Sequence, residues 1–304
     1  MMAPEPYLGA YPLEHRFMGV DIVWYLAAIL GVCITASLGV FVRRISPGND
    51  STIVFGRFFI GAVCLGLGLG LTGTLDIAQI TRISWVLVVS GVLMALLVVC
   101  YVKAIQTGTL ASASFLLYLG PLIAAGLSSI LTKVGISVAN WALLGCAFIG
   151  AILITNRNPE DDQGKNRGIV YGLAAGFFYG LYLTANNKDI MVDLPGPLIT
   201  LCQFAIASIA ILPSVVSSGI NLERADIPWL LAIGVLHGFI ALTLVVTSLT
   251  HLSTVGYGTI SYLEPLAAAI LGLVLYKEKL TIRQWIGCGL VLAAGVTRVI
   301  FAAT

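Results

Sequence analysis

The chain has 304 residues, of which 59% are hydrophobic and only 10% are charged, and its mean hydropathy is +1.00. An average soluble domain carries about 25% charged residues, so this composition cannot supply a polar coat and excludes a water-soluble globular protein. The net charge of +2 is too small to indicate a nucleic-acid partner or an acidic one. A lipid bilayer is the environment that such an apolar surface fits.

Residues 1–22 precede the first long apolar segment. They contain Glu5, Glu14 and Asp21, a single arginine and no apolar core, so they lack the pattern of a secretory signal peptide. We expect this part to form a short extramembrane N-terminal arm.

Ten long apolar segments follow the arm. A helix that crosses the bilayer needs about 20 mainly apolar residues, because the hydrocarbon core is about 30 Å thick. Barrel strands would alternate between polar and apolar residues over about 10 positions, whereas these segments are continuously apolar, which predicts an all-α integral membrane protein. The predicted spans are 23–42, 52–72, 84–104, 109–132, 138–155, 168–187, 196–218, 228–250, 254–276 and 282–303.

The most polar stretch of the chain lies between the fifth and sixth predicted spans. Its Asp161-Asp162 pair is of a kind that binds metal ions, but we interpret the stretch as a solvated linker. The chain is therefore divided into a first five-helix repeat (23–155), a polar linker (156–167) and a second five-helix repeat (168–304).

The two apolar halves repeat each other in sequence. At a shift of 144 positions, residues 118–122 (YLGPL) align with residues 262–266 (YLEPL), and 11 of the 28 positions from 118 to 145 are identical. The same shift pairs Trp141 with Trp285. Apolar composition alone produces matches of Leu and Ala, but it does not readily place Tyr, Pro, Lys and Trp in register.

The number of spans in each repeat determines how the halves are oriented. A shift of 146 extends the repeat toward its start, because it aligns Arg57-Phe58 with Gln203-Phe204. Five spans is an odd number, so the second copy must enter the membrane from the opposite side. The sequence thus predicts ten transmembrane helices in two inverted five-helix repeats, a construction found in many secondary transporters.

The second copy of the repeated block carries the most distinctive motifs of the chain. They are residues 262–269 (YLEPLAAA), 277–281 (KEKLT) and 287–290 (GCGL), with a degenerate version that begins at 118–121 (YLGP). With these motifs, and with Arg57-Phe58 near the start of its second span, the chain resembles the drug/metabolite transporter superfamily, in particular its EamA-type members.

The resemblance implies ten helices in two inverted repeats and alternating-access transport of small metabolites, often outward. It also implies a central cavity lined by helices 1, 3, 4, 6, 8 and 9. This chain departs from the pattern at Gly120 and Val134, where the family often has Glu, and at Lys277, which replaces the usual Gly before Glu278. Symmetric use of two carboxylates is therefore not expected here.

Glu264 lies near the middle of the ninth predicted span, where an ionisable group is costly and is a functional candidate. Helical spacing places Tyr257, Ser261 and Glu264 on one face, and Pro265 promotes a bend. One interpretation is a proton-coupling site or a counter-ion for an amine substrate. The other is a protonated Glu that bonds to a neighbouring helix and holds the packing.

His237 and Arg57 are further candidates for binding or coupling. His237, in the eighth span, either relays protons or bonds a substrate, or it is a neutral histidine satisfied by neighbouring backbone. Arg57, in the first turns of the second span, either extends its head to the membrane interface or turns inward to pair with a substrate carboxylate.

The sixth span carries Tyr179, Tyr182 and Asn186 at positions i, i+3 and i+7. Such an aromatic and amide face is able to receive an aromatic or cationic substrate, although ordinary packing produces the same pattern. The same span carries Gly172, Gly176 and Gly180, a small-xxx-small stripe that predicts close approach to another helix.

No cofactor and no metal site is predicted. Each cysteine lies in an apolar stretch, and no two have a metal-ligand spacing such as C-x-x-C, so a disulfide framework is not expected either. The cysteines are Cys33, Cys64, Cys100, Cys146, Cys202 and Cys288.

These features predict a secondary active transporter rather than an enzyme, because the sequence has neither H-E-x-x-H nor G-x-S-x-G. We expect it to export an amino acid, an amine or a related solute, as a monomer or homodimer, with protons as a hypothetical coupling ion. The alternatives are a passive channel or facilitator and, less favoured, an intramembrane enzyme. A channel predicts flux without stimulation by counter-substrate.

The expected location is the cell membrane, either the bacterial-type inner membrane or the plasma membrane. Orientation is ambiguous, because the excess of Lys and Arg on the loops of the other side places the termini outside, whereas the family resemblance implies cytoplasmic termini. We adopt the cytoplasmic placement as the expectation.

Overall fold

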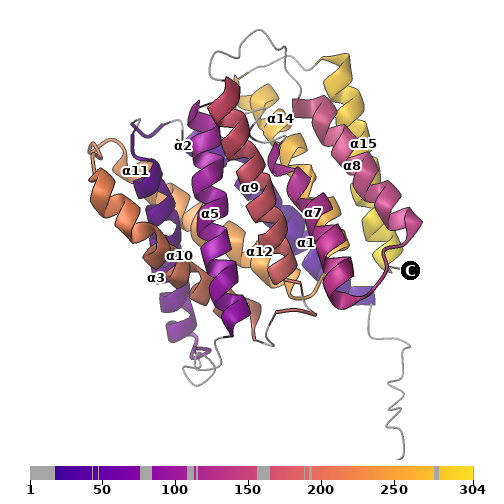
Figure 1. Ribbon diagram of the computed structural model, residues 1–304, viewed down its shortest axis with the longest axis horizontal. Coiled ribbons are helices and arrows are strands. Elements are labelled where there is room, and N and C mark those ends of the chain that lie inside the picture. The colour runs from indigo at the N-terminus through magenta and orange to yellow at the C-terminus, as the bar shows by residue number, and fades with distance from the viewer. Residues whose placement is uncertain are drawn as a thin grey trace, which may run out of the picture.

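The computed structural model describes most of the predicted membrane region. Residues 1–17 of the predicted arm and 156–164 of the predicted linker lie outside the described residues, as do residues 277–280. In the part of the chain that is described, all regular structure is helical (Figure 1). The described residues are 18–42, 44–46, 48–75, 84–107, 113, 116–155, 165–187, 189–191, 194–276 and 281–303.

The helices follow the apolar segments of the sequence. Short breaks divide the first and ninth predicted spans into two helices each. The eighth span is a continuous helix that contains a π-helical segment, and most other spans form one helix each. The helices are α1 (Met18–Ala36), α2 (Leu38–Val42), α3 (Asp50–Leu71), α5 (Trp85–Thr107), α7 (Leu119–Thr132), α8 (Val138–Thr155), α9 (Lys165–Ala185), α10 (Gly196–Ser218), α11 (Ile227–Ala232), η2 (Ile233–Ile240), α12 (Ala241–Leu249), α13 (Thr254–Ser261), α14 (Leu263–Tyr276) and α15 (Ile282–Ala303).

Two of the breaks between helices occur at corresponding positions of the two repeats. α7 begins after Tyr118 and α14 begins after Tyr262. In each case a proline, Pro121 or Pro265, stands three residues later and supplies no backbone N–H to the preceding turn. The YLxP motif therefore interrupts a span in both halves.

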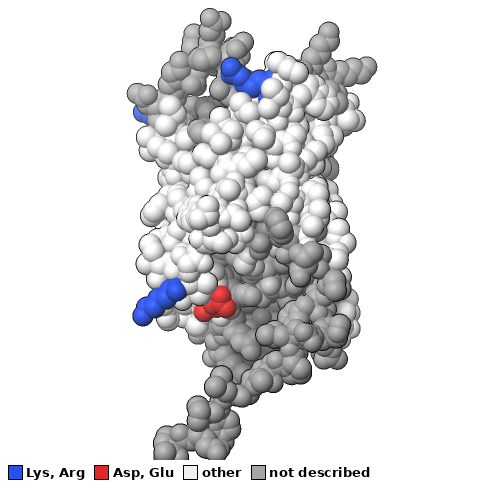
Figure 2. Space-filling view, turned by 90° about the vertical axis from the view of Figure 1, so that its right-hand side faces the viewer, with Lys and Arg blue, Asp and Glu red and all other residues white. Residues whose placement is uncertain are grey.

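The outside of the bundle is suited to lipid. Large apolar side chains such as Leu67, Leu71 and Val216 are 63%, 88% and 75% exposed. On the side seen in Figure 2, the described charged side chains lie toward the ends and the broad middle band has none. Six described helical segments are long and apolar enough to cross a membrane, and three shorter apolar helices accompany them. This is a multi-pass membrane protein.

The helices of the two halves pack in corresponding pairs. α5 packs against α9 as α12 packs against α1, and α7 packs against α9 as α13 and α14 pack against α1. Two further pairs, α3 with α10 and α8 with α15, each join a helix to its own counterpart in the repeat. α1 begins and α15 ends at the same end of the bundle (Figure 1).

Residues that correspond in the repeat also touch each other. The Tyr262 hydroxyl donates to the Tyr118 carbonyl at 2.8 Å, and the two rings lie 5.8 Å apart. Phe58 and Phe204, which align at the shift of 146, are both fully buried with ring centroids 6.0 Å apart. The halves therefore meet about a local two-fold relationship.

The predicted glycine stripe lies where α9 crosses α7 and the residues just before it. A Cβ atom at Gly172 would lie 2.6 Å from Leu116, one at Gly176 would lie 2.2 Å from the Leu116 carbonyl oxygen, and one at Gly180 would lie 2.6 Å from Ile123. Only glycine permits helices to approach this closely, so the prediction of a close crossing is confirmed.

Asp226, just before α11, connects two loops at one end of the bundle. Its Oδ2 atom accepts the Glu223 N–H at 3.0 Å, and Oδ1 accepts the Ser46 N–H at 3.1 Å and the Ser46 hydroxyl at 3.2 Å. These donors, the Glu223 N–H first among them, hold the pKa of the Asp226 carboxyl below its ordinary value.

The depressed pKa of Asp226 predicts a pH-dependent stability. A carboxylate of this kind stabilises the fold above its unfolded-state pKa of about 3.9 and loses that effect as the pH falls through the lower folded-state value. Asp226→Asn is therefore expected to lower the unfolding temperature at about pH 6, and the difference from wild type is expected to shrink as the pH falls below about 3.9. Glu223→Gln, which keeps the backbone donor, is the control. A difference that does not change with pH would contradict the prediction.

Candidate functional site

Glu264 occupies the first turn of α14, directly after the break at Tyr262. It is only partly buried, although five side chains from four other helices and the turn before α7 lie within electrostatic reach of its carboxylate. Among the described residues, no hydrogen bond or ion pair engages this carboxylate. The five side chains are Cys33, Arg57, Tyr118, Tyr179 and Tyr257.

Arg57 turns into the protein and does not reach the membrane interface. Its side chain is only 5% exposed, and its Nε atom donates to the His237 carbonyl at 3.3 Å. The interpretation of Arg57 as a snorkelling residue is therefore wrong, because the close packing of α3 on η2 directs the side chain inward. The guanidinium interacts electrostatically with Glu264, although no ion pair joins these two described residues.

His237 lies in η2, a π-helical segment of eight residues. The Ala241 N–H bonds to the Leu236 carbonyl, five residues earlier, before the four-residue spacing resumes in α12. Such a change of spacing leaves a carbonyl without a helical donor, and the His237 carbonyl accepts from Arg57 instead. The π-helix thus presents a backbone acceptor that orients the guanidinium.

The imidazole of His237 is fully buried against α1 and α2. Ser37 donates its hydroxyl to the Ile34 carbonyl at 2.8 Å, so its oxygen is left to accept from the His237 Nε2–H at 2.9 Å. The Nδ1 atom is then an acceptor, and it has no hydrogen-bond partner among the described residues. His237 therefore orients Arg57 through its backbone carbonyl, and its predicted role in substrate binding or proton relay stays a prediction.

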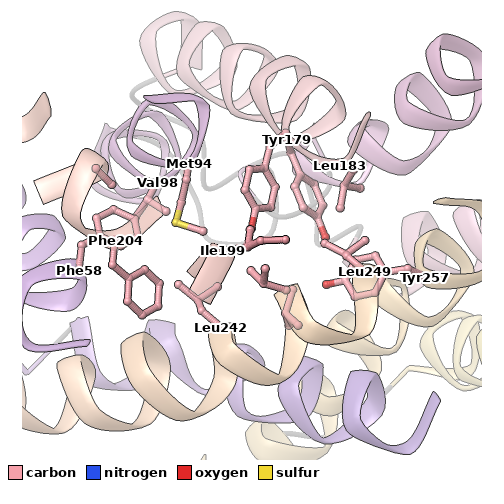
Figure 3. Packing of buried hydrophobic residues seen from close by; sticks show 14 of the residues in the cluster. Phe58, Met94, Val98, Tyr179, Leu183, Ile199, Phe204, Leu242, Leu249 and Tyr257 are labelled. Atoms are coloured by element: carbon pink, nitrogen blue, oxygen red, sulfur yellow. The ribbon is translucent and has the colours of Figure 1, made fainter. Parts of the chain in front are cut away.

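The predicted face of the ninth span is assembled around Tyr179. Tyr257 and Ser261 on α13 are 2% and 1% exposed, and both side chains lie within interaction range of Tyr179 on α9. Tyr179 and Tyr257 belong to the large buried cluster drawn in Figure 3. This aromatic group lies beside Glu264.

The other residues predicted on the sixth span are held in a separate network. Gln203 on α10 donates from Nε2 to Ser90 Oγ and to Asn186 Oδ1, both at 2.7 Å, and accepts from the Tyr182 hydroxyl at 3.4 Å. Gln203, Ser90 and Asn186 are completely buried. Tyr182 interacts electrostatically with Arg57, and Asn186 donates from Nδ2 to the Tyr182 carbonyl at 2.8 Å.

Sequence reasoning missed Gln203 as the centre of this network. Its signal was present, because Gln203 aligns with Arg57 at the shift of 146. Each of the two residues ties its helix to a neighbouring helix through a buried polar contact, Arg57 to η2 and Gln203 to α5. Cys33, which lies near Glu264, was considered only as a small hydrophobe.

The arrangement places a partly buried carboxylate and a buried guanidinium on different helices, with tyrosine side chains within electrostatic reach of each. A carboxylate binds ammonium groups, tyrosine faces favour cations, and a guanidinium binds carboxylates in a bidentate manner. Among the described residues, no group of three or more His, Cys, Asp and Glu side chains is arranged to hold a metal ion. All six cysteines are free thiols.

An apolar helical bundle built from two repeats, with opposite charges in its interior, defines a membrane transporter. The sequence pattern of the EamA-like transporter family matches residues 22–156 and 166–297, so the chain belongs to the EamA-like transporter family. The resemblance to the drug/metabolite transporter superfamily is thereby confirmed.

Two individual proteins are similar to the chain over most of its length. An uncharacterized transporter from Archaeoglobus fulgidus is 24% identical over 267 residues, which cover 88% of this chain and 93% of the relative. A protein of known crystal structure has 18% sequence identity and a TM-score of 0.74, covering 94% of this chain and 100% of the other. At that identity the second similarity shows the fold alone.

Proposed function

We propose that the protein is a secondary active transporter that moves a small zwitterionic solute, an amino acid in particular, by alternating access. In this proposal the chain crosses the membrane ten times, as two inverted five-helix repeats. The corresponding packing pairs of the two halves, and the common end at which α1 begins and α15 ends, support that topology. Exchange of conformations between two such halves opens a central site to one side and then to the other.

The observation that carries the proposal is the state of the two interior charges. The Glu264 side chain is partly buried and its carboxylate has no polar partner among the described residues, and the Arg57 guanidinium lies within electrostatic reach without forming an ion pair with it. Two opposite charges held apart inside a membrane are costly unless something engages both. An amino acid satisfies both, with its ammonium at Glu264 and its carboxylate at Arg57.

Replacing Glu264 with Gln tests the proposal. The variant keeps the shape but removes the charge that would bind the ammonium, so amino-acid uptake into liposomes is expected to fall by at least about tenfold, which corresponds to one charge-assisted hydrogen bond. Glu278 is the only other acidic residue near this span, and Glu278→Gln is the control. Uptake by Glu264→Gln that equals wild type would refute the proposed role.

Proton antiport through Glu264 is part of the proposal. It requires that the pH dependence of uptake disappear in Glu264→Gln, and an unchanged pH dependence would remove it. Export as the direction of transport, location in the cell membrane with cytoplasmic termini, and a monomeric or homodimeric state complete the proposal. The chemistry of the interior charges does not require a catalytic role.

A carrier differs from a channel or facilitator in its response to substrate on both sides. Cys33 is exposed and lies within electrostatic reach of Glu264. In a variant that retains only this cysteine, an alternating-access carrier would expose the thiol to a membrane-impermeant reagent from one side at a time. Accelerated exchange with counter-substrate would support a carrier, and simultaneous labelling from both sides would support a channel.

A further inference from the structure

The repeat places two different pairs of residues in corresponding positions. The shift of 144 aligns Glu264 with Gly120, and the shift of 146 aligns Cys33 with Tyr179. Both pairs join the two halves. The Cys33 thiol on α1 lies within electrostatic reach of Glu264 on α14, and Tyr179 on α9 packs directly on Gly120 of α7. The first pair therefore combines a small side chain with a carboxylate, and the corresponding pair combines a large ring with no side chain.

The contact between Tyr179 and Gly120 leaves no room for a second carboxylate. A Cβ atom added at Gly120 would lie 2.5 Å from Tyr179 Cδ1 and 2.9 Å from both Cβ and Cγ of the same residue. The ring cannot withdraw easily, because Tyr179 is 9% exposed and packs within the large buried cluster. Tyr179 thus fills the position at which the repeat would otherwise present a counterpart of Glu264.

We propose that Tyr179, seated on Gly120, is a specificity-determining residue that limits the site to solutes with a single ammonium group. The inference rests on the proposed function, in which Glu264 binds that ammonium. With one carboxylate and a ring in place of the other, a second cationic group would gain at most a cation–π contact with the ring, which does not offset the loss of its hydration in a desolvated site. The preferred solute is a neutral amino acid, and a dibasic one is rejected.

Norleucine and lysine are suitable probes, because their side chains have the same four carbons and lysine carries an additional ammonium group on the last of them. Binding of each is measured by thermal stabilisation of the detergent-purified full chain. Wild type is expected to prefer norleucine by at least about tenfold in apparent Kd. Gly120→Glu/Tyr179→Cys, which copies the Cys33–Glu264 pair into the corresponding α7–α9 position, is expected to reduce or reverse that preference by at least about tenfold.

Further variants keep the inference open to refutation if the double variant does not fold. Gly120→Ala is expected to destabilise the protein, whereas Gly126→Ala on the same helix is not, since its Cβ would meet nothing within 4 Å. Tyr179→Ala, which removes the ring without adding a charge, is expected to lower the norleucine preference about threefold or more. The inference is overturned if a folded Gly120→Glu/Tyr179→Cys variant keeps the wild-type preference for norleucine over lysine. If that variant does not fold, the same result in Tyr179→Ala overturns it.

Glu264→Gln separates this inference from the proposed function. In one outcome, wild type binds norleucine, Glu264→Gln loses that binding, and the Tyr179 variants keep the wild-type preference for norleucine over lysine. The inference about Tyr179 then fails, and the proposed function stands. If norleucine and lysine both leave wild type unstabilised, or if Glu264→Gln binds norleucine as wild type does, the proposed function fails and the inference fails with it.

Discussion

Replacing Arg57 with Met is expected to abolish amino-acid transport, with a loss of roughly a hundredfold or more, because a bidentate charge-assisted contact to the solute disappears. The same variant is expected to lose stability. Arg57 is buried and interacts electrostatically with Glu264, so its removal leaves an interior carboxylate without an opposite charge nearby, which is destabilising. Liposome uptake and thermal unfolding in detergent measure the two effects.

A second variant distinguishes loss of the site from loss of the fold. Arg57→Met/Glu264→Gln is neutral at both positions, so we expect it to recover most of the stability that Arg57→Met loses while it remains inactive. Arg57→Lys retains the charge but lacks the planar fork that donates to the His237 carbonyl, and an intermediate activity is expected. Full activity of Arg57→Met would show that the guanidinium does not bind the solute.

Substitution of Gly238 by Ala is expected to have the largest effect on folding. A Cβ atom at Gly238 would lie 2.1 Å from the Arg57 carbonyl oxygen and 3.2 Å from the Arg57 carbonyl carbon. Both are backbone atoms, so no side chain can move aside and α3 must separate from η2. The expected cost is about 3 kcal/mol or more, seen as a lower unfolding temperature or as failure to recover monodisperse protein.

Gly66→Ala provides the matched control on the opposing helix, α3. Its Cβ would meet Leu201 Cδ1 at 3.6 Å, an ordinary contact, and Gly to Ala within a helix typically stabilises by roughly 0.5–1 kcal/mol. Equal stability of the Gly238→Ala and Gly66→Ala variants would contradict the close contact between α3 and η2.

Much of the helix pattern was predictable because polar and helix-breaking residues mark its boundaries. α8 and α10 have the predicted bounds, 138–155 and 196–218, because Asn, Pro and Gly residues flank long apolar runs. The interruption before Glu264 was anticipated from Pro265, which cannot donate to the preceding turn. These are local properties of the chain, so the local sequence was sufficient.

The interior geometry depends on contacts between distant segments, which local sequence does not specify. Nothing near His237 distinguishes a π-helix from an α-helix, although Gly234 and Gly238 permit the close approach of α3. The direction of the Arg57 side chain likewise follows from the acceptor that this π-helix offers. The absence of a carboxylate at Gly120 was noticed from the sequence, but its cause, the ring of Tyr179, required the structure.

The hydrogen bond from the Tyr262 hydroxyl to the Tyr118 carbonyl has a direction, and a perfectly symmetric pair of repeats would not. The reciprocal bond, from the Tyr118 hydroxyl to the Tyr262 carbonyl, is not formed in the described part of the chain. If the halves trade conformations during a transport cycle, as we propose, the donor role passes from one tyrosine to the other. Each of the two tyrosine hydroxyls would then donate its hydrogen bond in one of the two facing states and lose it in the other, so the pair would stabilise both states in turn.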